Sequence, residues 1–154
     1  MKKINSKLYR FAMSKFTTGL TVVTVNNNDQ YIGKTVNSFA SLSLKPPLVL
    51  FSLDKKSSSI EIYKKSNYMG INILSKNQKK ISTFFSLKNS KWIDQNIFFK
   101  ENKIPMINGC LANLSCKIVK IIKQGDHFIF ICRIEKILID NKKKPLIYFN
   151  SKYI

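Results

Sequence analysis

The chain has 154 residues, enough for a single domain over 1–154 with one hydrophobic core, and its hydrophobic fraction of 44% is ordinary for a globular protein. The formal net charge of +19 comes from lysines scattered in ones, twos and threes, with only Arg10 and Arg133 beside them and no nucleic-acid-binding motif, so we expect a solvated surface and no nucleic-acid partner. No apolar run approaches the ~20 residues of a membrane span, and the lysine-rich start has no signal-peptide core, so we expect a soluble, cytoplasmic protein without a membrane partner.

Periodic apolar residues near the start predict a helix. The pattern follows Ser6, and Gly19 would end the helix, because glycine readily adopts the left-handed conformation found just past a helix end. The residues that share this apolar face are Leu8, Phe11, Ala12 and Phe16.

A β-hairpin and a further strand are expected next. Residues 20–25 are rich in β-branched side chains and run into Asn-Asn-Asn-Asp, which favours a turn, so a second strand over 31–38 would complete the hairpin. Pro46 and Pro47 then interrupt the chain before the apolar run 48–51. This run has the composition of a strand that is buried on both faces.

Two capping-box patterns predict short helices. Ser58 precedes Glu61 by three residues, and Ser75 precedes Gln78 by the same spacing. In a capping box the hydroxyl and the later side chain each satisfy one free backbone amide. Between the two boxes, residues 68–74 alternate large apolar residues with glycine and asparagine, which predicts a strand with one apolar face.

The last third of the chain predicts a long hairpin. After a loop over 89–96, two strands over 111–122 and 127–139 flank the turn residues 123–126. Many strands with few, short helices predict a mainly β fold built as an antiparallel barrel.

The cysteines favour neither a metal site nor a disulfide. Cys110, Cys116 and Cys132 occur singly, and His127 is the only histidine in the sequence, so no metal site is expected. Cys116 and Cys132 could face each other across the long hairpin. The odd count and the expected compartment nevertheless favour reduced, buried thiols.

The stretch 33–53 carries the clearest functional pattern. Small hydroxyl residues and an asparagine follow one another in a segment that otherwise has the composition of extended chain, and such side-chain and backbone donors and acceptors suit a flat ring with polar edges. The polar residues in question are Thr35, Asn37, Ser38 and Ser41. From the residues alone, Asn37 and Ser38 would equally well satisfy a turn or a strand end.

The order of these residues resembles the flavin reductase family, the short NAD(P)H:flavin oxidoreductases that serve two-component monooxygenases. Resembling segments cover nearly the whole chain and follow the family's order, although 88–94 has no close match and the end of the chain is slightly short. The segments that carry the resemblance are 16–24, 35–53, 71–74 with Gln78, 109–116 and 125–127.

This resemblance implies a mainly β fold with short helices, the FMN-binding split β-barrel, which binds FMN or FAD and usually forms a homodimer. It places residues after the first hairpin against the flavin ring and residues of the next strand beside the ribityl chain. Their role would be orientation and redox tuning, because the flavin carries the redox chemistry. The residues implied for the ring are Thr35, Asn37, Ser38, Phe39, Ala40 and Ser41, and those for the ribityl chain are Ser52 and Leu53.

The start of the expected second helix is the candidate site for the flavin phosphate. Lys56, Ser57 and Ser59 lie there, where free backbone amides and the helix dipole favour an anion. The alternative is ordinary capping of a surface helix. Capping accounts for Ser58 and Glu61 but leaves the neighbouring serines and lysines without a role.

Gly125, Asp126 and His127 are the candidate site for the nicotinamide nucleotide. A lone histidine at a strand start is commonly a packed or solvated structural residue. The resemblance instead implies that this histidine contacts the nicotinamide nucleotide. Gly125 would allow the tight turn, Asp126 would fix it through side-chain to backbone bonds, and His127 would present a donor. No catalytic acid or base is expected, because hydride transfer depends on stacking and close approach.

The sequence therefore predicts an NAD(P)H:flavin oxidoreductase that uses NADH or NADPH to reduce FMN or FAD and supplies reduced flavin to a partner monooxygenase. The net charge of +19 would speed encounters with these anionic ligands. Three other functions stay open. They are another enzyme on the same barrel, such as a pyridoxamine-phosphate-oxidase-like or haem-degrading protein, a non-catalytic flavin carrier, and a basic nucleic-acid-binding barrel.

Overall fold

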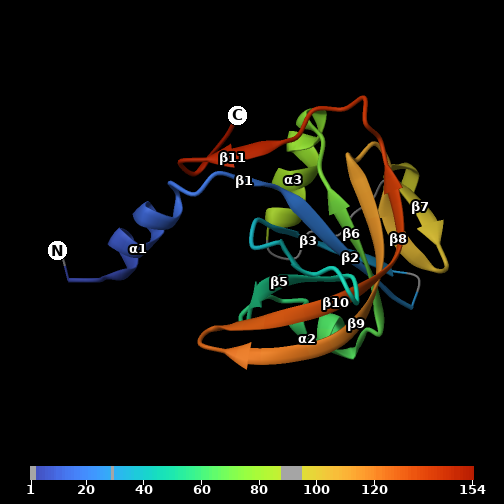
Figure 1. The fold of residues 1–154 in the computed structure, drawn as a ribbon, viewed down its shortest axis with the longest axis horizontal. Coiled ribbons are helices and arrows are strands. Elements are labelled where there is room, and N and C mark those ends of the chain that lie inside the picture. The colour runs from blue at the N-terminus through green and yellow to red at the C-terminus, as the bar shows by residue number, and fades with distance from the viewer. Residues whose placement is uncertain (1–2, 29, 88–94) are drawn as a thin grey trace.

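The computed structural model describes residues 3–28, 30–87 and 95–154, and strand predominates in them, as predicted. The helices are short and lie outside the main sheet (Figure 1). The loop predicted over 89–96 lies largely outside the described residues. The helices are α1 (Ser6–Met13), α2 (Ile60–Lys65) and α3 (Lys79–Ser86), with 3-10 turns at Lys76–Gln78 and Gln95–Ile97.

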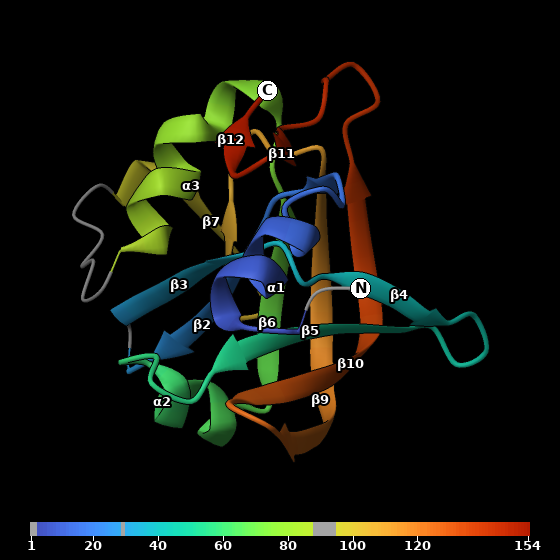
Figure 2. The same cartoon turned by 90° about the vertical axis from the view of Figure 1, so that its left-hand side faces the viewer.

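The main sheet of the described chain has seven antiparallel strands in the order β3-β2-β6-β9-β10-β5-β4. The sheet is strongly curved, but its edge strands β3 and β4 do not pair with each other, so the curve stays open (Figure 2). The predicted barrel is therefore split. Its strands are β2 (Thr21–Asn27), β3 (Gln30–Val36), β4 (Ala40–Ser43), β5 (Leu48–Asp54), β6 (Tyr68–Ile73), β9 (Ala112–Gln124) and β10 (His127–Ile139).

Smaller strand groups cover the outside of this sheet. One is a hairpin that packs against β2 and β6, and the other joins the segment before β2 to the end of the chain. The hairpin strands are β7 (Phe98–Glu101) and β8 (Ile104–Ile107), and the other group consists of β1 (Thr18–Gly19), β11 (Ile147–Phe149) and β12 (Lys152–Tyr153).

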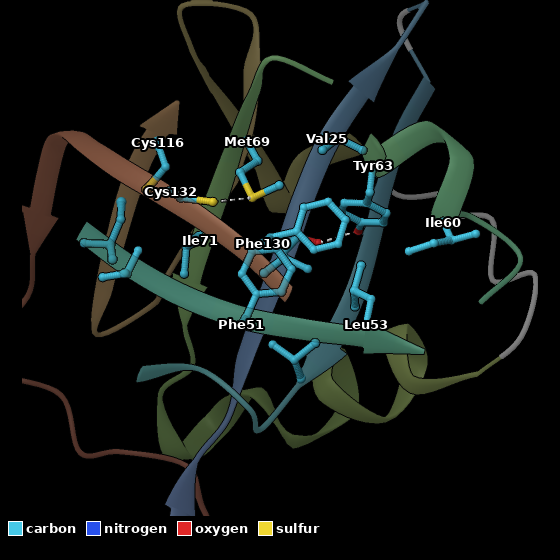
Figure 3. Close-up of a cluster of buried hydrophobic side chains, with 14 residues drawn as sticks. Val25, Phe51, Leu53, Ile60, Tyr63, Met69, Ile71, Cys116, Phe130 and Cys132 are labelled. Carbon is cyan, nitrogen blue, oxygen red and sulfur yellow. Dashed lines mark hydrogen bonds between the residues drawn. The ribbon is translucent and has the colours of Figure 1, made fainter. Parts of the chain in front are cut away.

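The larger hydrophobic core fills the inside of the curve (Figure 3). Phe51 of β5 stacks on Phe130 of β10 with ring centroids 5.1 Å apart, and Tyr63 of α2 packs edge-on against Phe130. The Tyr63 hydroxyl donates a hydrogen bond of 2.8 Å to the Val23 carbonyl, so this buried polar group is satisfied. These contacts fix α2, and with it the chain segment between β5 and α2, against the sheet.

Strand β6 differs from the prediction, because both of its faces are buried. It lies between β2 and β9, and β8 covers its second face, so Gly70 and Asn72 are buried too. The Asn72 side chain donates to the Val22 carbonyl at 2.9 Å and accepts from the Ile107 amide at 2.9 Å and from Asn113 at 2.8 Å. Asn72 in the predicted strand pattern is therefore a buried residue that connects β6 to β2, β8 and β9. It does not indicate a solvent-facing side of the strand.

Strand β5 differs in the opposite sense. The apolar run at its start predicts burial on both faces, but only Val49, Phe51 and Leu53 are buried, while Leu48 and Leu50 are half-buried. The reason is the position of β5, which has only the short edge strand β4 on one side of the open sheet. Its outer face consequently lacks a full covering layer in the single chain.

The N-terminal helix is present, but Gly19 does not end it. Helix α1 stops at Met13 with Ser14 as its C-cap, and Gly19 belongs to β1. None of the α1 side chains is buried, and the helix stands away from the sheet (Figure 1). Its apolar face has no counterpart within the described chain.

One predicted capping box is confirmed and the other is wrong. Gln78 accepts a hydrogen bond of 2.9 Å from the Ser75 amide at the start of the turn that leads into α3. Helix α2 begins at Ile60 with Ser59 as N-cap, and the Ser59 side chain makes no capping bond. Ser58 lies one residue too early to cap this helix.

Candidate functional site

A cavity of about 450 Å³ opens where the ends of β3 and β5 meet the segment that precedes α2. This volume lies in the usual range of small-molecule sites. A larger hollow of about 930 Å³ lies between the β2–β3 turn, α2 and the β7–β8 turn, but it contains none of the predicted site residues. The smaller cavity is lined by Lys34, Thr35, Val36, Asn37, Ser38, Ser52, Leu53, Asp54, Lys56, Ser57, Ser58, Ser86 and His127.

Eight of the predicted site residues meet in this cavity, although they come from three separate parts of the sequence. The other predicted residues lie beside it. Phe39 packs against the core, Ala40 and Ser41 lie on the exposed edge strand β4, and Ser59 is the N-cap of α2. Gly125 and Asp126 form the turn just before His127. The eight lining residues are Thr35, Asn37, Ser38, Ser52, Leu53, Lys56, Ser57 and His127.

Hydrogen bonds of small hydroxyl side chains build the wall of the cavity. The Ser38 hydroxyl accepts from the Ser52 amide at 3.0 Å and donates to the Ser52 carbonyl at 3.1 Å. The Thr35 hydroxyl donates to the Ser82 carbonyl of α3 at 2.7 Å. Both hydroxyl groups therefore bond to the backbone. For Ser38 this agrees with the alternative that the residue satisfies a strand end. The two residues flank Asn37, which also lines the cavity.

One of the residues that line the cavity has a hydroxyl group without a partner. The Ser57 hydroxyl is buried and has no hydrogen-bond partner within the described part of the chain. Leaving such a group unsatisfied costs about 1–3 kcal/mol, so a bound acceptor would stabilise it. Lys34 and Lys56 line the same cavity and Asp54 is the acidic residue among the lining side chains, so the donor set fits an anionic group such as a phosphate.

The backbone amides expected to bind this phosphate are already used. The amide of Lys56 donates to the Asp54 carboxylate at 2.7 Å, and the amide of Ser57 donates to the Asp54 carbonyl at 3.0 Å. Helix α2 starts only at Ile60, beyond the cavity lining. The fit to an anion consequently rests on side chains and not on the helix start.

Lys34 and Ser86 belong to the cavity but escaped the sequence analysis. The Lys34 ammonium group donates to the carbonyls of Ser86 and Leu87, at 3.1 and 3.3 Å, and so ties β3 to the end of α3. Lys34 directly precedes the polar run that begins at Thr35, which is the one sequence signal for it. Nothing in the sequence predicts that Lys34 contacts Ser86 of α3, which lies 52 residues further along the chain.

The predicted long hairpin is confirmed and brings His127 to the cavity. The turn between β9 and β10 has Gly125 at a positive φ of 54°, a conformation that glycine adopts without strain. His127 lies opposite Asp54 of β5 in the strand register. The amide of Lys55 donates to the Asp126 carbonyl at 3.0 Å, which fixes the turn against the end of β5.

The Asp126 side chain bonds mainly to His127. Its carboxylate lies 2.7 Å from Nδ1 of the imidazole, and this hydrogen bond is the first cause of a lowered pKa of the carboxyl group. The bond to its own backbone amide, which resembles the one expected from the sequence, is the second cause. Asp126 thus holds the histidine as well as the turn.

Known proteins resemble this chain over most of its length. A family profile described as flavin reductase like domain matches residues 13–154. The FMN reductase (NADH) SmoA of Agrobacterium fabrum is 39% identical over 127 residues, which cover 82% of this chain and 73% of that protein. The flavin-dependent monooxygenase reductase subunit HsaB of Mycobacterium tuberculosis is 32% identical over 154 residues, covering 98% of this chain and 82% of HsaB.

A solved structure shares the fold. The NADH:FAD oxidoreductase SgcE6 of Streptomyces globisporus C-1027, in complex with NAD and FAD fragments, superposes with a TM-score of 0.90 at 25% sequence identity. The match covers all of this chain (100%) and 96% of SgcE6. This likeness confirms the predicted split-barrel class, a mainly β fold with short helices.

Proposed function

The chain belongs to the family of flavin reductase like domains, and on that premise we propose that it is an NAD(P)H-dependent flavin reductase. It reduces FMN or FAD and supplies the reduced flavin to a partner monooxygenase. The observation that carries the proposal is the cavity in which eight predicted flavin and nicotinamide residues converge, among them Ser57 with its unpartnered hydroxyl. The relatives' own names, an FMN reductase that uses NADH and the reductase subunit of a monooxygenase, support the same reaction and the same kind of partner.

The flavin would lie along the cavity with its phosphate at Ser57. The Ser57 hydroxyl and the Lys56 ammonium group would bind the phosphate, and Ser52 and Leu53 would flank the ribityl chain. Asn37 would meet a polar edge of the ring system. These residues would hold the flavin, which when bound would supply the redox chemistry as the acceptor of hydride from the reduced nicotinamide. Phe39, Ala40 and Ser41 would form the outer margin of the site, whereas Ser59, the N-cap of α2, lies outside the lining.

The nicotinamide nucleotide would enter at the turn formed by Gly125, Asp126 and His127. His127 lines the cavity beside the ends of β3 and β5, so a nucleotide bound there would be close to the flavin ring. The protein's contribution is to bind and orient the two ligands face to face and to exclude water from between them. Such positioning supplies much of the rate enhancement in reactions that need close approach.

We further propose that the protein is a homodimer. Helix α1 buries none of its side chains, and the side chains of Tyr9 and Phe11 are 55% and 61% exposed. The edge strand β4 and the turn after it expose Leu42 and Leu44. A helix of this length is marginal in water unless it packs against another surface, and a second copy of the chain would cover both apolar regions.

The same proposal includes one domain over residues 1–154 and a cytoplasmic location. The family profile begins at residue 13, and α1 would belong with the rest of the domain through the dimer. Cys110, Cys116 and Cys132 are free, which suits a reducing compartment. Among the helices of the described residues, none is long and apolar enough to span a membrane.

Nucleotide oxidation by the purified chain tests the proposed reaction. NADH and NADPH consumption is followed with FMN and FAD added in turn and with no flavin as the control. We expect consumption that depends on added flavin and continues beyond one turnover per chain. A pyridoxamine-phosphate-oxidase-like enzyme or a flavin carrier would consume neither nucleotide in this way, and that result would overturn the proposal.

A further inference from the structure

The turn between β9 and β10 contains a carboxylate that touches the cavity histidine but does not itself line the cavity. Asp126 Oδ1 lies 2.7 Å from His127 Nδ1, the Asp126 side chain is 89% exposed, and the His127 side chain is 42% exposed. His127 belongs to the cavity lining and Asp126 does not. We propose that Asp126 is a positioning residue that fixes the His127 ring with Nε2 as the nitrogen available to the nicotinamide nucleotide.

The chemistry of the pair decides which nitrogen carries the bound proton. An ionised carboxylate only accepts hydrogen bonds, so Nδ1 must carry hydrogen whenever it bonds to Asp126. The pKa of Asp126 lies below its usual range, because His127 donates this bond, so the carboxylate is ionised at neutral pH. Nε2 is then the nitrogen left for a ligand, and it makes no hydrogen bond within the described residues.

The backbone around the pair is fixed from both sides. His127 lies opposite Asp54 of β5 and opposite Gln124 of β9, and the amide of Lys55 donates to the Asp126 carbonyl. A turn held in this way keeps the carboxylate within reach of the ring. The other charged residues nearby in the strand register and the adjoining turn are Asp54, Lys55, Lys56 and Lys123.

The fixed tautomer makes nucleotide binding depend on the charge of the ring. With hydrogen held at Nδ1, Nε2 donates a hydrogen bond only when the ring is protonated and accepts one when the ring is neutral. The pyrophosphate oxygens of a nicotinamide dinucleotide only accept hydrogen bonds. A hydrogen bond from Nε2 to the pyrophosphate therefore requires the protonated ring.

This inference rests on the proposed function, and its test uses kinetics of the intact chain. We expect Asp126→Ala to raise KM for NADH about tenfold, the loss that one hydrogen bond to a charged group commonly causes, with kcat nearly unchanged. Asp126→Asn keeps an oxygen that accepts from Nδ1, so it should raise KM less than Asp126→Ala does. Flavin affinity should stay at the parent value in both variants.

Two further variants separate positioning from other roles. In a His127→Ala background, Asp126→Ala should add no further loss, because the two residues act as one unit. Asp140→Ala is the matched control, since Asp140 is another turn aspartate that bonds a neighbouring lysine, Lys143, and lies away from the cavity. It should leave KM unchanged.

Three outcomes would overturn the inference while leaving the proposed function intact. They are an unchanged KM in Asp126→Ala, an additive loss in the double variant, and a joint fall of melting temperature and flavin affinity. Absence of flavin-dependent NADH oxidation in the parent chain would instead reject the proposed function itself.

Discussion

The proposed fit of the cavity to a flavin phosphate depends strongly on one atom, the Ser57 hydroxyl oxygen. Its buried, unpartnered hydroxyl lies in the cavity, whereas Ser59, two residues further on, lies outside the lining. Ser57→Ala should weaken flavin binding by about 1.5–3 kcal/mol, the usual contribution of a hydrogen bond to a charged group. Ser59→Ala is the matched control and should bind flavin like the parent. Fluorescence titration with FMN and FAD measures both, and equal affinity of parent and Ser57→Ala would show that the phosphate binds elsewhere.

The three cysteines give a prediction that is independent of the site. Burial raises the pKa of the Cys110 thiol to about 11 and that of Cys132 to about 12, and it raises the pKa of Cys116 as well. Because the thiolate is the reactive form, a thiol reagent should label none of them in the folded chain and all three after unfolding. Rapid labelling of the folded chain would contradict this burial.

The same burial predicts the direction of a pH effect on stability. Above about pH 8.5, thiols of the unfolded chain lose protons while the buried thiols keep them. The unfolded state then binds fewer protons than the folded state, so the free energy of unfolding falls as pH rises through this range. Denaturant titrations at neutral and alkaline pH would measure the fall, and a Cys132→Ala variant should show a smaller one.

For single residues, the sequence predicted which residues belong to the site better than it predicted which contacts they make. Thr35 and Ser38 were predicted from a local pattern and His127 from the family resemblance, and all three line the cavity. Lys34 and Ser86 were missed, because their bond depends on β3 packing beside α3, a long-range arrangement that no local pattern contains. The amides of Lys56 and Ser57 were misjudged for a different reason, because Asp54, two and three residues earlier, accepts their hydrogen bonds locally.

Among the elements, strand β6 is sensitive to a small change at Gly70. A methyl group at Gly70 would lie 2.5 Å from the Thr24 hydroxyl and 2.7 Å from the Pro105 carbonyl, whereas one at Gly19 would meet nothing within 4 Å. Gly70→Ala should therefore destabilise the fold by about 1–3 kcal/mol or more, as overpacked cores do. Gly19→Ala is the matched control, and its melting temperature should stay close to that of the parent. Equal melting temperatures for the two variants would contradict the packing described for β6.

The existence of the elements followed from periodicity and turn chemistry, while their burial did not. The long hairpin was predicted because turn residues separate two long apolar segments, and β9 and β10 confirm it. The burial of β5 and β6 was misjudged, because it depends on each strand's place in the sheet and not on its own sequence. The start of α2 was set one residue early, since Ser58 and Ser59 offer the same capping chemistry.

For the whole molecule, the exposed apolar side chains of α1 lead us to expect a dimer. If a second copy covers this helix, the parent chain should sediment as a dimer at micromolar concentration, and replacing both Tyr9 and Phe11 with serine should shift it toward the monomer. Val119→Ser is the control, because Val119 is an exposed apolar residue of β9 outside the helix. It should leave the sedimentation coefficient unchanged. A monomeric parent chain, or a variant that remains fully dimeric, would contradict this role of α1.

The overall architecture was predicted in class but not in detail. Abundant short strands indicated a barrel, and the resemblance specified a split one. The order β3-β2-β6-β9-β10-β5-β4 could not be predicted from the sequence, because pairings such as β2 with β6 join strands separated by about 40 residues of intervening sequence. That order is what brings the ends of β3 and β5 together and so creates the cavity.

Anaerobic reduction of flavin by NADH tests the central claim most directly. With catalytic amounts of the purified chain and an excess of FMN or FAD, the absorbance of oxidised flavin is followed after NADH is added, and a sample without protein is the control. We expect many turnovers per chain and one flavin reduced for each NADH consumed, because flavin binds, is reduced and leaves. Flavin absorbance that stays at the level of the protein-free control, with both flavins and with NADPH in place of NADH, would contradict the account.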